Sequence, residues 1–399
     1  MALGLLLFLW GLIYWAQVGD TAPGVDAMTY GALAKHVLSS GDWATLHYSS
    51  QAYSDFYQHP PGAIWLSALG FRLWGASDLT LRILPSLCAL LTGGIIYRWA
   101  RIQGGAWMGF CASLILLTST RFVKYTQTFM LDPFLALFLT WAGFELFEWL
   151  NGRGGAVRRG GVLGLSLATA LLMKGVPALI LVPVVLILLW GQGRRESIRF
   201  MLSLAIGGGV ILLPWFFWLE GASYLSRYWS ESVVGRATPR SAESLLAPSR
   251  NLLKQYWPWL VLWLWASVRW LRRNRGRDAL APAGIPFLLS WGILGGFSIA
   301  GSFLEHYLVP FYPFAALAIA SEFSESLRGR AREVRWVVGV STVVAAVLVL
   351  GMFVRVRRGG LEQSPFRQAL MQSAREFPSA KILRISSTAT ELWSGLAAG

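Results

Sequence analysis

Charged residues are scarce in this sequence. Only 14% of the 399 residues are charged and 55% are hydrophobic, and the mean hydropathy is +0.51. Because soluble domains carry about 25% charged residues, this balance argues against a soluble protein and indicates a polytopic membrane protein. The net charge of +15 does not indicate nucleic-acid binding, since the arginines stand in short clusters between apolar runs, as they do in cytoplasmic loops.

Cysteine and histidine are also rare, with two and four residues respectively. Cys88 and Cys111 both fall in apolar segments, which favours buried small hydrophobic side chains over a disulfide. Four scattered histidines argue against a His-rich metal site, and the sequence has no P-loop, dinucleotide fingerprint, nucleophile elbow or zinc motif. We therefore expect no required cofactor. Binding of a divalent metal such as Mg²⁺ or Mn²⁺ is an alternative, and its ligands are unknown.

Apolar runs make up most of the chain. A spanning helix needs about 20 mostly apolar residues, and on that measure we predict an all-α polytopic membrane protein with about eleven transmembrane helices. The predicted spans are residues 2–18, 78–100, 105–120, 128–150, 160–173, 176–191, 200–219, 252–271, 282–302, 305–323 and 336–354. Met1 to Val18 has no basic leader region and no convincing cleavage site, so we predict a retained first transmembrane helix rather than a signal peptide.

The arginine clusters predict the orientation of these helices. With a cytoplasmic amino end, the clusters that fall inside are Arg98 and Arg101, Arg153 to Arg159, Arg194 to Arg199, Arg269 to Arg277, and Arg328 to Arg335. The outer face then receives the large loops 19–77 and 220–251. We expect one transmembrane domain, residues 1–354, and a short outer C-terminal tail, residues 355–399, that is too small for an independent core.

The first outer loop is polar and rich in aromatic and turn residues, unlike the apolar runs around it. Residues 27–38 place Tyr30, Leu33 and Val37 on one side at helical spacing, which predicts an amphipathic juxtamembrane helix. Asp26 stands at the start of this helix. A carboxylate there either caps free backbone N–H groups or takes part in catalysis, and the local pattern leaves both interpretations open.

Asp132, in M-L-D-P-F-L-A-L-F, lies at the start of an apolar helix with no cation beside it in the sequence. An ionisable side chain in such a place costs a few kcal/mol, which makes it a functional candidate. The alternative is an interfacial cap, with Pro133 at the first helical position. We favour a functional role for Asp132. Arg121 and Lys124 are near enough in sequence to lie in the same site.

Two cationic side chains also fall on the outer face. His59, in H-P-P-G, precedes a short predicted helix from Ile64 to Trp74, and the amino end of a helix is a favourable place to meet an anion. A structural histidine is the more common case when the pattern is taken alone. Lys174 stands at the outer end of a helical hairpin, where it is either a snorkelling lysine or part of the site.

Two further segments combine polar and aromatic residues on this face. In loop 220–251, arginines such as Arg227 and Arg236 alternate with aromatic residues, a pattern that suits phosphate binding and an ordinary interfacial loop equally well. Glu305, His306 and Tyr307 follow one another at the mouth of an apolar helix, and packing alone does not explain three polar groups there.

Taken in order, these segments resemble the glycosyltransferase C superfamily. The segments are V-D-A-M-T-Y-G-A-L-A-K-H, F-Y-Q-H-P-P-G-A-I-W, L-R-I-L-P-S-L, M-L-D-P-F-L-A-L-F, L-L-M-K-G-V-P-A-L, L-L-P-W, R-Y-W-S-E-S-V-V-G-R and H-Y-L-V-P-F-Y-P. They cover residues 1 to about 325. Within the superfamily they are similar to bacterial relatives of the dolichyl-phosphate-mannose protein mannosyltransferases and of the lipid A aminoarabinose transferases.

The resemblance implies a role for each matching residue. Asp26 matches an acidic residue that acts as base or positions the acceptor, and Asp132 matches the second acidic position. His59 occupies a site that is His in the protein mannosyltransferases and Lys in the aminoarabinose enzymes, where it faces the lipid phosphate. Arg236 and Tyr307 fall where the family contacts that phosphate.

The remaining candidates complete the predicted site. Lys174 adds positive charge for the donor phosphate, on the physical argument that a departing anionic phosphate is helped by fixed cations. Tyr30, Gln58, Glu305 and His306 are predicted to support it.

Two positions depart from the family pattern. Asp26 is followed by Ala27, where the family often has a second acidic residue. Gln58 stands where the aminoarabinose enzymes carry a Glu that can bind metal. Both departures weaken the case for a metal and for lipid A as acceptor.

The resemblance implies an inverting glycosyltransferase that takes a sugar from a polyprenyl-phosphate donor and passes it to a lipid, glycan or protein acceptor. We expect it in the bacterial cytoplasmic membrane, with its site on the outer, periplasmic face and no nucleic-acid partner. The alternative is a transporter or flippase of lipid-linked glycans. A transporter keeps polar groups along a path near the midplane, whereas here they gather at one face, which favours an enzyme.

Overall fold

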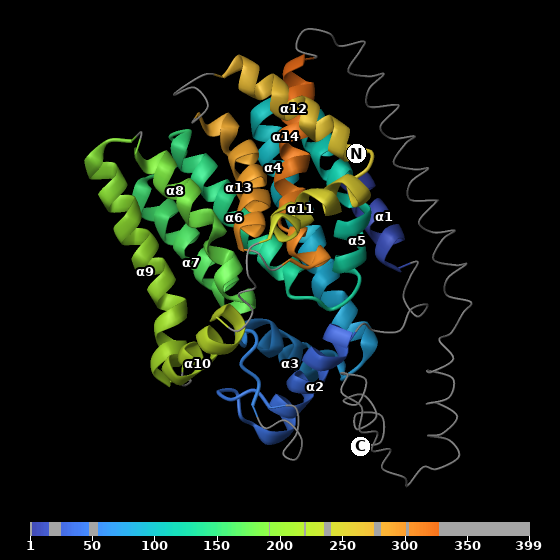
Figure 1. Ribbon diagram of the computed structural model, residues 1–399, viewed down its shortest axis with the longest axis vertical. Helices are drawn as coiled ribbons and strands as arrows, with labels where there is room; N and C mark the ends of the chain where they lie inside the picture. Colours follow the sequence, from blue (N-terminus) through green and yellow to red (C-terminus); the bar gives the residue numbers. More distant parts are fainter. Residues whose placement is uncertain are drawn as a thin grey trace.

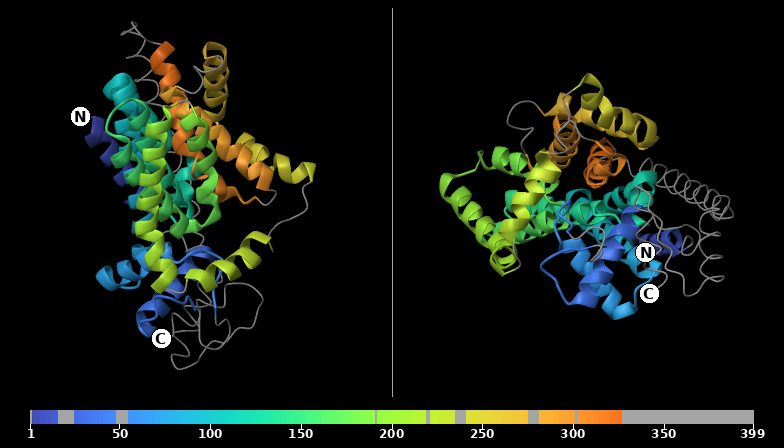
Figure 2. Two further views of the ribbon diagram at one scale, coloured as in Figure 1. Left: turned by 90° about the vertical axis from the view of Figure 1, so that its left-hand side faces the viewer. Right: turned by 60° about the horizontal axis from the view of Figure 1, so that its bottom comes forward.

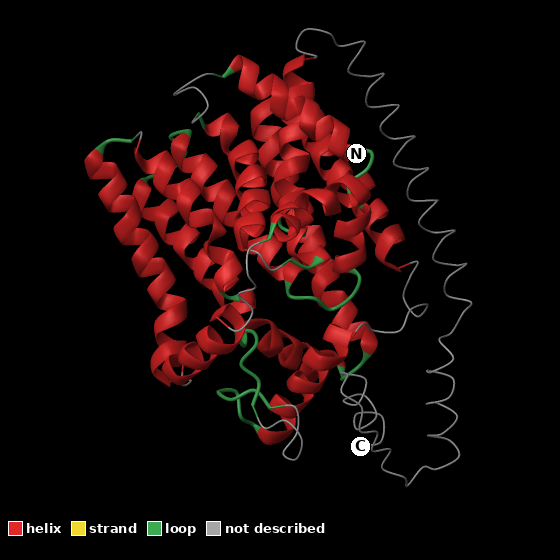
Figure 3. Cartoon of the chain, viewed as in Figure 1, coloured by secondary structure: helices red, strands yellow, loops and turns green. Residues whose placement is uncertain are grey.

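The structure is a computed structural model that describes residues 2–15, 25–47, 55–190, 192–218, 221–234, 241–274, 281–300 and 303–326. Within these ranges every regular element is helical and no strand occurs (Figure 3). The all-α prediction is therefore confirmed for this part of the chain. The predicted span 336–354 and the tail 355–399 lie outside the described residues.

Most of the longer helices run side by side along the long axis of the molecule, and α2 and α3 lie together at one end of them (Figure 1, Figure 2). The helices are α1 Ala2–Trp15, α2 Val25–Ser40, α3 Gly62–Trp74, α4 Asp78–Leu117, α5 Thr120–Thr126, α6 Asp132–Leu150, α7 Ala156–Lys174, α8 Leu181–Trp190, α9 Arg194–Trp218, α10 Gly221–Tyr228, α11 Ala242–Gln255, α12 Trp259–Arg273, α13 Ile285–Ala300 and α14 Phe311–Ser326. Short 3-10 or π-helical segments are η1 Val176–Ile180, η2 Trp229–Val234, η4 Pro282–Gly284 and η5 Glu305–Leu308.

Helices occupy each predicted span up to 305–323. Five of those in the described part of the chain are long and apolar enough to cross a membrane: Leu79–Leu117, Asp132–Leu150, Ala156–Lys174, Arg194–Phe217 and Pro282–Ala300. The surface of α9 agrees with a lipid environment, because Ile206, Val210, Leu213 and Phe217 are each more than half exposed. These residues follow one another at helical spacing, so they form an apolar stripe along one side of the helix.

Helix α4 is two helices joined by a reversal. Gly104 and Gly105 have non-helical backbone angles, and the φ of +86° at Gly105 is one that side-chain-bearing residues rarely adopt. The second arm folds back on the first, since Ser113 Oγ donates to the Gly93 carbonyl oxygen at 3.0 Å. The break lies between the predicted spans 78–100 and 105–120.

Ion pairs show how α6 and α7 run. At the carboxyl end of α6, Arg159 Nη1 lies 2.6 Å from Glu145 Oε2 and Arg159 Nη2 lies 2.9 Å from Glu148 Oε2. At the other end, Lys174 Nζ pairs with Asp132 Oδ1. The two helices are therefore antiparallel, with arginines at one end of the bundle and the predicted site residues at the other.

Helix α14 spans the same two ends. His306, just before α14, has its Nε2 atom 3.9 Å from Asp132 Oδ2. Near the carboxyl end of α14, Glu322 Oε1 accepts a hydrogen bond from Arg273 Nη2 at 2.6 Å. We call the end with Asp132 the site end and the end with Arg159 and Arg273 the arginine-rich end.

Two predictions about the outer loops are corrected by the structure. Segment 220–251 is not a plain loop, because α10, η2 and the first part of α11 fall in it and Tyr224 and Tyr228 are buried. A helix, α2, occupies the segment predicted to be amphipathic, but burial extends around it to include Ala27 and Ala32 as well as Leu33. It packs on α3 as part of the protein core.

Glycines let α7 and α9 pack backbone to backbone. A Cβ atom at Gly160 would lie 2.4 Å from the Phe200 carbonyl oxygen, and one at Gly164 would lie 2.1 Å from the Leu204 carbonyl oxygen. Since lipid tails give no hydrophobic drive for helices to associate, such close van der Waals approach is what stabilises helix pairs in a membrane.

We predict that Gly164→Ala lowers the free energy of unfolding by about 1–3 kcal/mol, because the helices must separate to admit the methyl group. Gly94→Ala is the matched control, since nothing lies within 4 Å of a Cβ atom there. Thermal unfolding in detergent measures both. Equal midpoints for the two variants would contradict the packing argument.

Candidate functional site

Asp132 and Lys174 form a buried ion pair at the centre of the site end. Asp132 is 1% exposed and Lys174 is 3% exposed, and Lys174 Nζ donates to Asp132 Oδ1 across 42 residues of sequence. The N-cap of α6 is Leu131 and makes no side-chain capping bond. The cap interpretation of Asp132 is therefore wrong, and so is the snorkelling interpretation of Lys174.

Two residues of η5 complete this centre. Lys174 Nζ lies 4.7 Å from the centre of the Tyr307 ring, a cation–π distance. The ring of His306 lies 4.9 Å from that of Tyr307. Within the described residues, Asp132 Oδ2 accepts no hydrogen bond and His306 Nε2 is 3.9 Å away from it. Three elements thus bring together a carboxylate, an ammonium, an imidazole and a phenol.

Asp26 lies at the same end of the molecule. It falls in the first turn of α2 and is half-buried. The charges of Asp132 and Asp26 both act on His306. Both carboxylates therefore lie near its ring.

Glu305 is held by three donors from two other elements. Tyr125 Oη donates to Glu305 Oε2 at 3.0 Å, Gln255 Nε2 donates to Oε1 at 2.8 Å, and Arg121 Nη1 lies 3.2 Å from Oε2. The charges of Arg121 and Lys124 also act on the Glu305 carboxylate.

This network links α5 and α11 to η5, and sequence reasoning missed two of its members. The ring of Tyr125 lies 5.8 Å from that of His306, so the network adjoins the centre. Gln255 lies 50 residues before Glu305, and no local pattern marks either Tyr125 or Gln255.

The His59 segment packs on the turn that follows Lys174. A Cβ atom at Gly175, whose φ is +81°, would lie 3.3 Å from Pro60 Cγ and 2.2 Å from Tyr228 Oη. The His59 carbonyl oxygen accepts a hydrogen bond from Tyr224 Oη. His59 therefore stands next to the segment that carries Lys174, as the predicted site requires.

Aromatic rings fix the orientation of His59. Its ring centroid lies 6.0 Å from that of Tyr30 and 6.2 Å from that of Phe56. The carbonyl oxygen of Gln58, whose side chain is exposed, accepts from Ser232 Oγ at 3.0 Å. The helix after His59 begins at Gly62, with Pro61 as its N-cap.

The sequence singled out two arginines in segment 220–251, Arg227 and Arg236. Arg227 Nη1 lies 3.3 Å from Asp55 Oδ2, and its guanidinium lies 4.8 Å from the centre of the Tyr57 ring. It therefore holds α10 to the first loop. Arg236 lies outside the described residues.

No metal-binding cluster of side chains occurs in the part of the chain that the structure describes. No three His, Cys, Asp or Glu side chains gather there in a way that could hold a metal ion. Cys88 and Cys111 are both free, as their apolar surroundings predict.

Sequence comparisons agree with the resemblance. The family described as dolichyl-phosphate-mannose-protein mannosyltransferase matches residues 58–218. The undecaprenyl phosphate-alpha-4-amino-4-deoxy-L-arabinose arabinosyl transferase of Edwardsiella ictaluri is 27% identical over 350 residues, covering 82% of this chain and 61% of that enzyme. The enzyme of the same name from Aeromonas hydrophila is 25% identical, over 81% of this chain and 61% of its own length. The chain thus spans about three fifths of the length of these curated relatives.

Solved structures show the fold. ArnT from Cupriavidus metallidurans bound to undecaprenyl phosphate superposes with a TM-score of 0.76 at 19% identity, covering 99% of this chain and 84% of that one. The apo oligosaccharyltransferase of Archaeoglobus fulgidus gives a TM-score of 0.68 at 11% identity, covering 95% of this chain and 58% of that one. The sequence matches therefore agree with the predicted resemblance, and the solved structures show the same fold.

Proposed function

We propose that this chain, a relative of the aminoarabinose and protein mannosyl transferases with a glycosyltransferase C fold, is an integral membrane glycosyltransferase. It takes a hexose or pentose from a polyprenyl phosphate and transfers it to a lipid, glycan or protein acceptor at the outer, periplasmic face of the bacterial cytoplasmic membrane. The observation that carries the proposal is the meeting of Asp132, Lys174, His306 and Tyr307 at one end of the bundle, with Asp26 and the His59 segment beside them.

The chemistry follows from these groups. The acceptor oxygen attacks the anomeric carbon on the side opposite the phosphate, the bond from that carbon to the phosphate oxygen breaks, and the lipid phosphate leaves with the electron pair. Asp26 takes the proton of the attacking hydroxyl, as a general base must stand near it. His59, Lys174 and Arg236 hold the phosphate, because cations placed in advance stabilise the charge that develops there.

Asp132 has a different role in this proposal from Asp26. Its carboxylate is bound to Lys174 and so keeps an ammonium charged in a buried place, which an isolated lysine would not sustain. Asp132 is therefore a positioning residue for the phosphate-binding cation, while Asp26 is the base. Tyr30, Gln58, Glu305 and His306 support these groups, and no step requires a divalent metal ion.

The membrane arrangement completes the proposal. We propose about eleven spans with the arginine-rich end in the cytoplasm, residues 1–354 as the transmembrane domain and residues 355–399 as an outer tail. An apolar groove between the helices at the site end holds the prenyl chain of the donor.

We predict that Asp26→Asn lowers sugar transfer by about 10²–10⁴-fold, because an amide cannot accept the proton. Asp42→Asn is the matched control in the same loop, since Asp42 accepts from the backbone N–H groups of Ala44 and Thr45. Asn can make the same bonds, so that variant should turn over normally. Transfer from a radiolabelled polyprenyl-phosphate sugar in proteoliposomes measures both, and normal turnover in Asp26→Asn would refute its role.

Asp132→Asn leaves Lys174 charged and uncompensated, which we expect to destabilise the protein by about 3–5 kcal/mol. The double variant Asp132→Asn/Lys174→Met removes both charges and separates folding from chemistry. We expect it to unfold near the wild-type temperature and to have lost donor binding. A double variant that folds and still transfers sugar would show that the pair is structural only.

His59→Ala should raise the KM for the donor by about ten-fold or more, the effect of one hydrogen bond to a charged group. His59→Lys should restore most of the affinity for the donor, because an ammonium also binds a phosphate. His36→Ala serves as control in the neighbouring helix. Steady-state kinetics with varied donor measure the three, and an unchanged KM in His59→Ala would remove His59 from the phosphate site.

A further inference from the structure

A cavity lies at the arginine-rich end of the bundle. Its volume is about 770 Å³, within the range of small-molecule pockets, and parts of α4, α12, α13 and α14 line it. Phe147 and Asn151 also line it, whereas Asp132 begins the same 19-residue helix. At a rise of about 1.5 Å per residue the two places lie roughly 28 Å apart. The cavity is therefore separate from the proposed transfer site.

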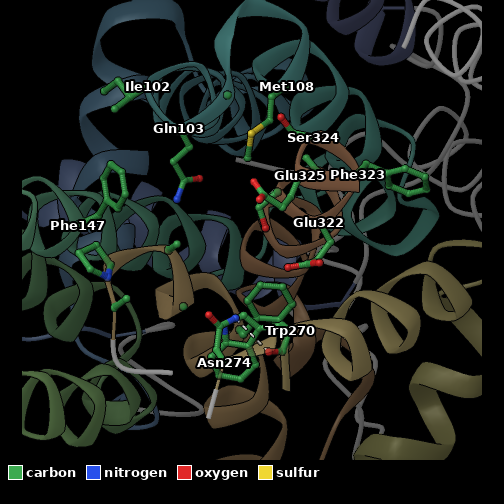
Figure 4. A pocket seen from close by; sticks show the side chains of 18 of the residues that line it. Ile102, Gln103, Met108, Phe147, Trp270, Asn274, Glu322, Phe323, Ser324 and Glu325 are labelled. Atoms are coloured by element: carbon green, nitrogen blue, oxygen red, sulfur yellow. Dashed lines mark hydrogen bonds between the residues drawn. The ribbon is translucent and has the colours of Figure 1, made fainter. Parts of the chain in front are cut away.

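Two hydrogen-bond acceptors in its wall lack donors. Glu322 is 1% exposed, and its Oε1 atom accepts from Arg273 Nη2 at 2.6 Å. Within the described residues, Glu322 Oε2 accepts no hydrogen bond, although it forms an ion pair with Arg269 Nε at 3.6 Å. Gln103 Oε1 is also buried without a donor. Figure 4 shows Gln103, Glu322 and Glu325 around one hollow.

The rest of the wall limits the chemistry of a ligand. Trp270 and Phe287 stack at 4.8 Å on one side and present aromatic surface. Arg153 and Arg273 bring two guanidinium groups, each of which also meets a glutamate, Glu148 at 3.4 Å and Glu322. A guanidinium has five N–H donors, so each keeps donors beyond that one contact.

We propose that this cavity binds a headgroup that carries a primary ammonium and a phosphate, the phosphoethanolamine class. The buried oxygens of Glu322 and Gln103 need N–H donors, which a primary ammonium supplies and a quaternary ammonium lacks. The aromatic wall attracts either kind of ammonium, so the preference for a primary ammonium rests on these two oxygens. Arg153 and Arg273 bind the phosphate, because guanidinium groups form charge-assisted hydrogen bonds with phosphates.

A divalent metal is the poorer occupant. No cluster of three or more His, Cys, Asp or Glu ligands occurs in the described ranges, and the two arginines in the wall would repel it. The headgroup comes either from a lipid of the adjacent leaflet, which we place on the cytoplasmic side, or from a soluble phosphoamine.

The test uses the full chain purified in detergent, with phosphatidylethanolamine, phosphatidylcholine, phosphatidylglycerol and soluble O-phosphoethanolamine as probes. Native mass spectrometry measures the bound fraction and thermal unfolding measures the stabilisation. We expect phosphatidylethanolamine to bind at least about ten-fold more tightly than the other two lipids. Competition by O-phosphoethanolamine at similar concentration would identify a soluble ligand, whereas lack of competition would identify the lipid, and both results uphold the ammonium site.

Variants of residues in the cavity wall test whether the lipid binds in the cavity. Glu322→Gln and Gln103→Leu should each remove the preference for phosphatidylethanolamine, and Gln103→Leu keeps the ion pair of Glu322 in case the first variant fails to fold. Glu196→Gln is the control, since Glu196 pairs with Arg199 at 2.8 Å on the surface of α9 and does not line the cavity. Equal binding of the three lipids, or an unchanged preference in Gln103→Leu, would overturn the proposal.

Discussion

The buried pair of Asp132 and Lys174 is the interaction on which the site end depends. It joins the first residue of α6 to the last residue of α7, so it fixes the turn at Gly175 on which the His59 segment packs. Neither charge is tolerable there alone, because an uncompensated ion in a low-dielectric interior costs several kcal/mol. Together they present a cation to Tyr307 and a carboxylate to His306.

The helices and the acidic residues were predictable from the sequence for simple reasons. An apolar run of spanning length has few alternatives to a helix in a membrane, and helices occupy the predicted ranges in the described residues. The predicted span 252–271 is the exception, because α11 ends at Gln255 and a separate helix, α12, begins at Trp259. Asp132 was marked by the cost of placing a carboxylate in such a run. Its partner was not predictable, because Lys174 lies 42 residues away and only the antiparallel packing of α6 and α7 brings them together.

The polar segments were harder to predict because their structure depends on tertiary contacts. The burial around α2 comes from α3 and from neighbouring rings such as Phe56 and Phe129, and no periodicity in its sequence shows this. The helical character of α10 is associated with the burial of Tyr224 and Tyr228 against Trp215 and Leu172. The donors around Glu305 come from α5 and α11, which local patterns do not connect.

The reversal at Gly105 decides at which end of the bundle the later segments lie. As one straight helix, the 40 residues of α4 would measure about 60 Å. Because the second arm folds back along the first, the chain returns towards the end from which α4 started. A residue at position 105 that straightened α4 would carry every later segment to the other end, and Asp132 would then lie far from Asp26.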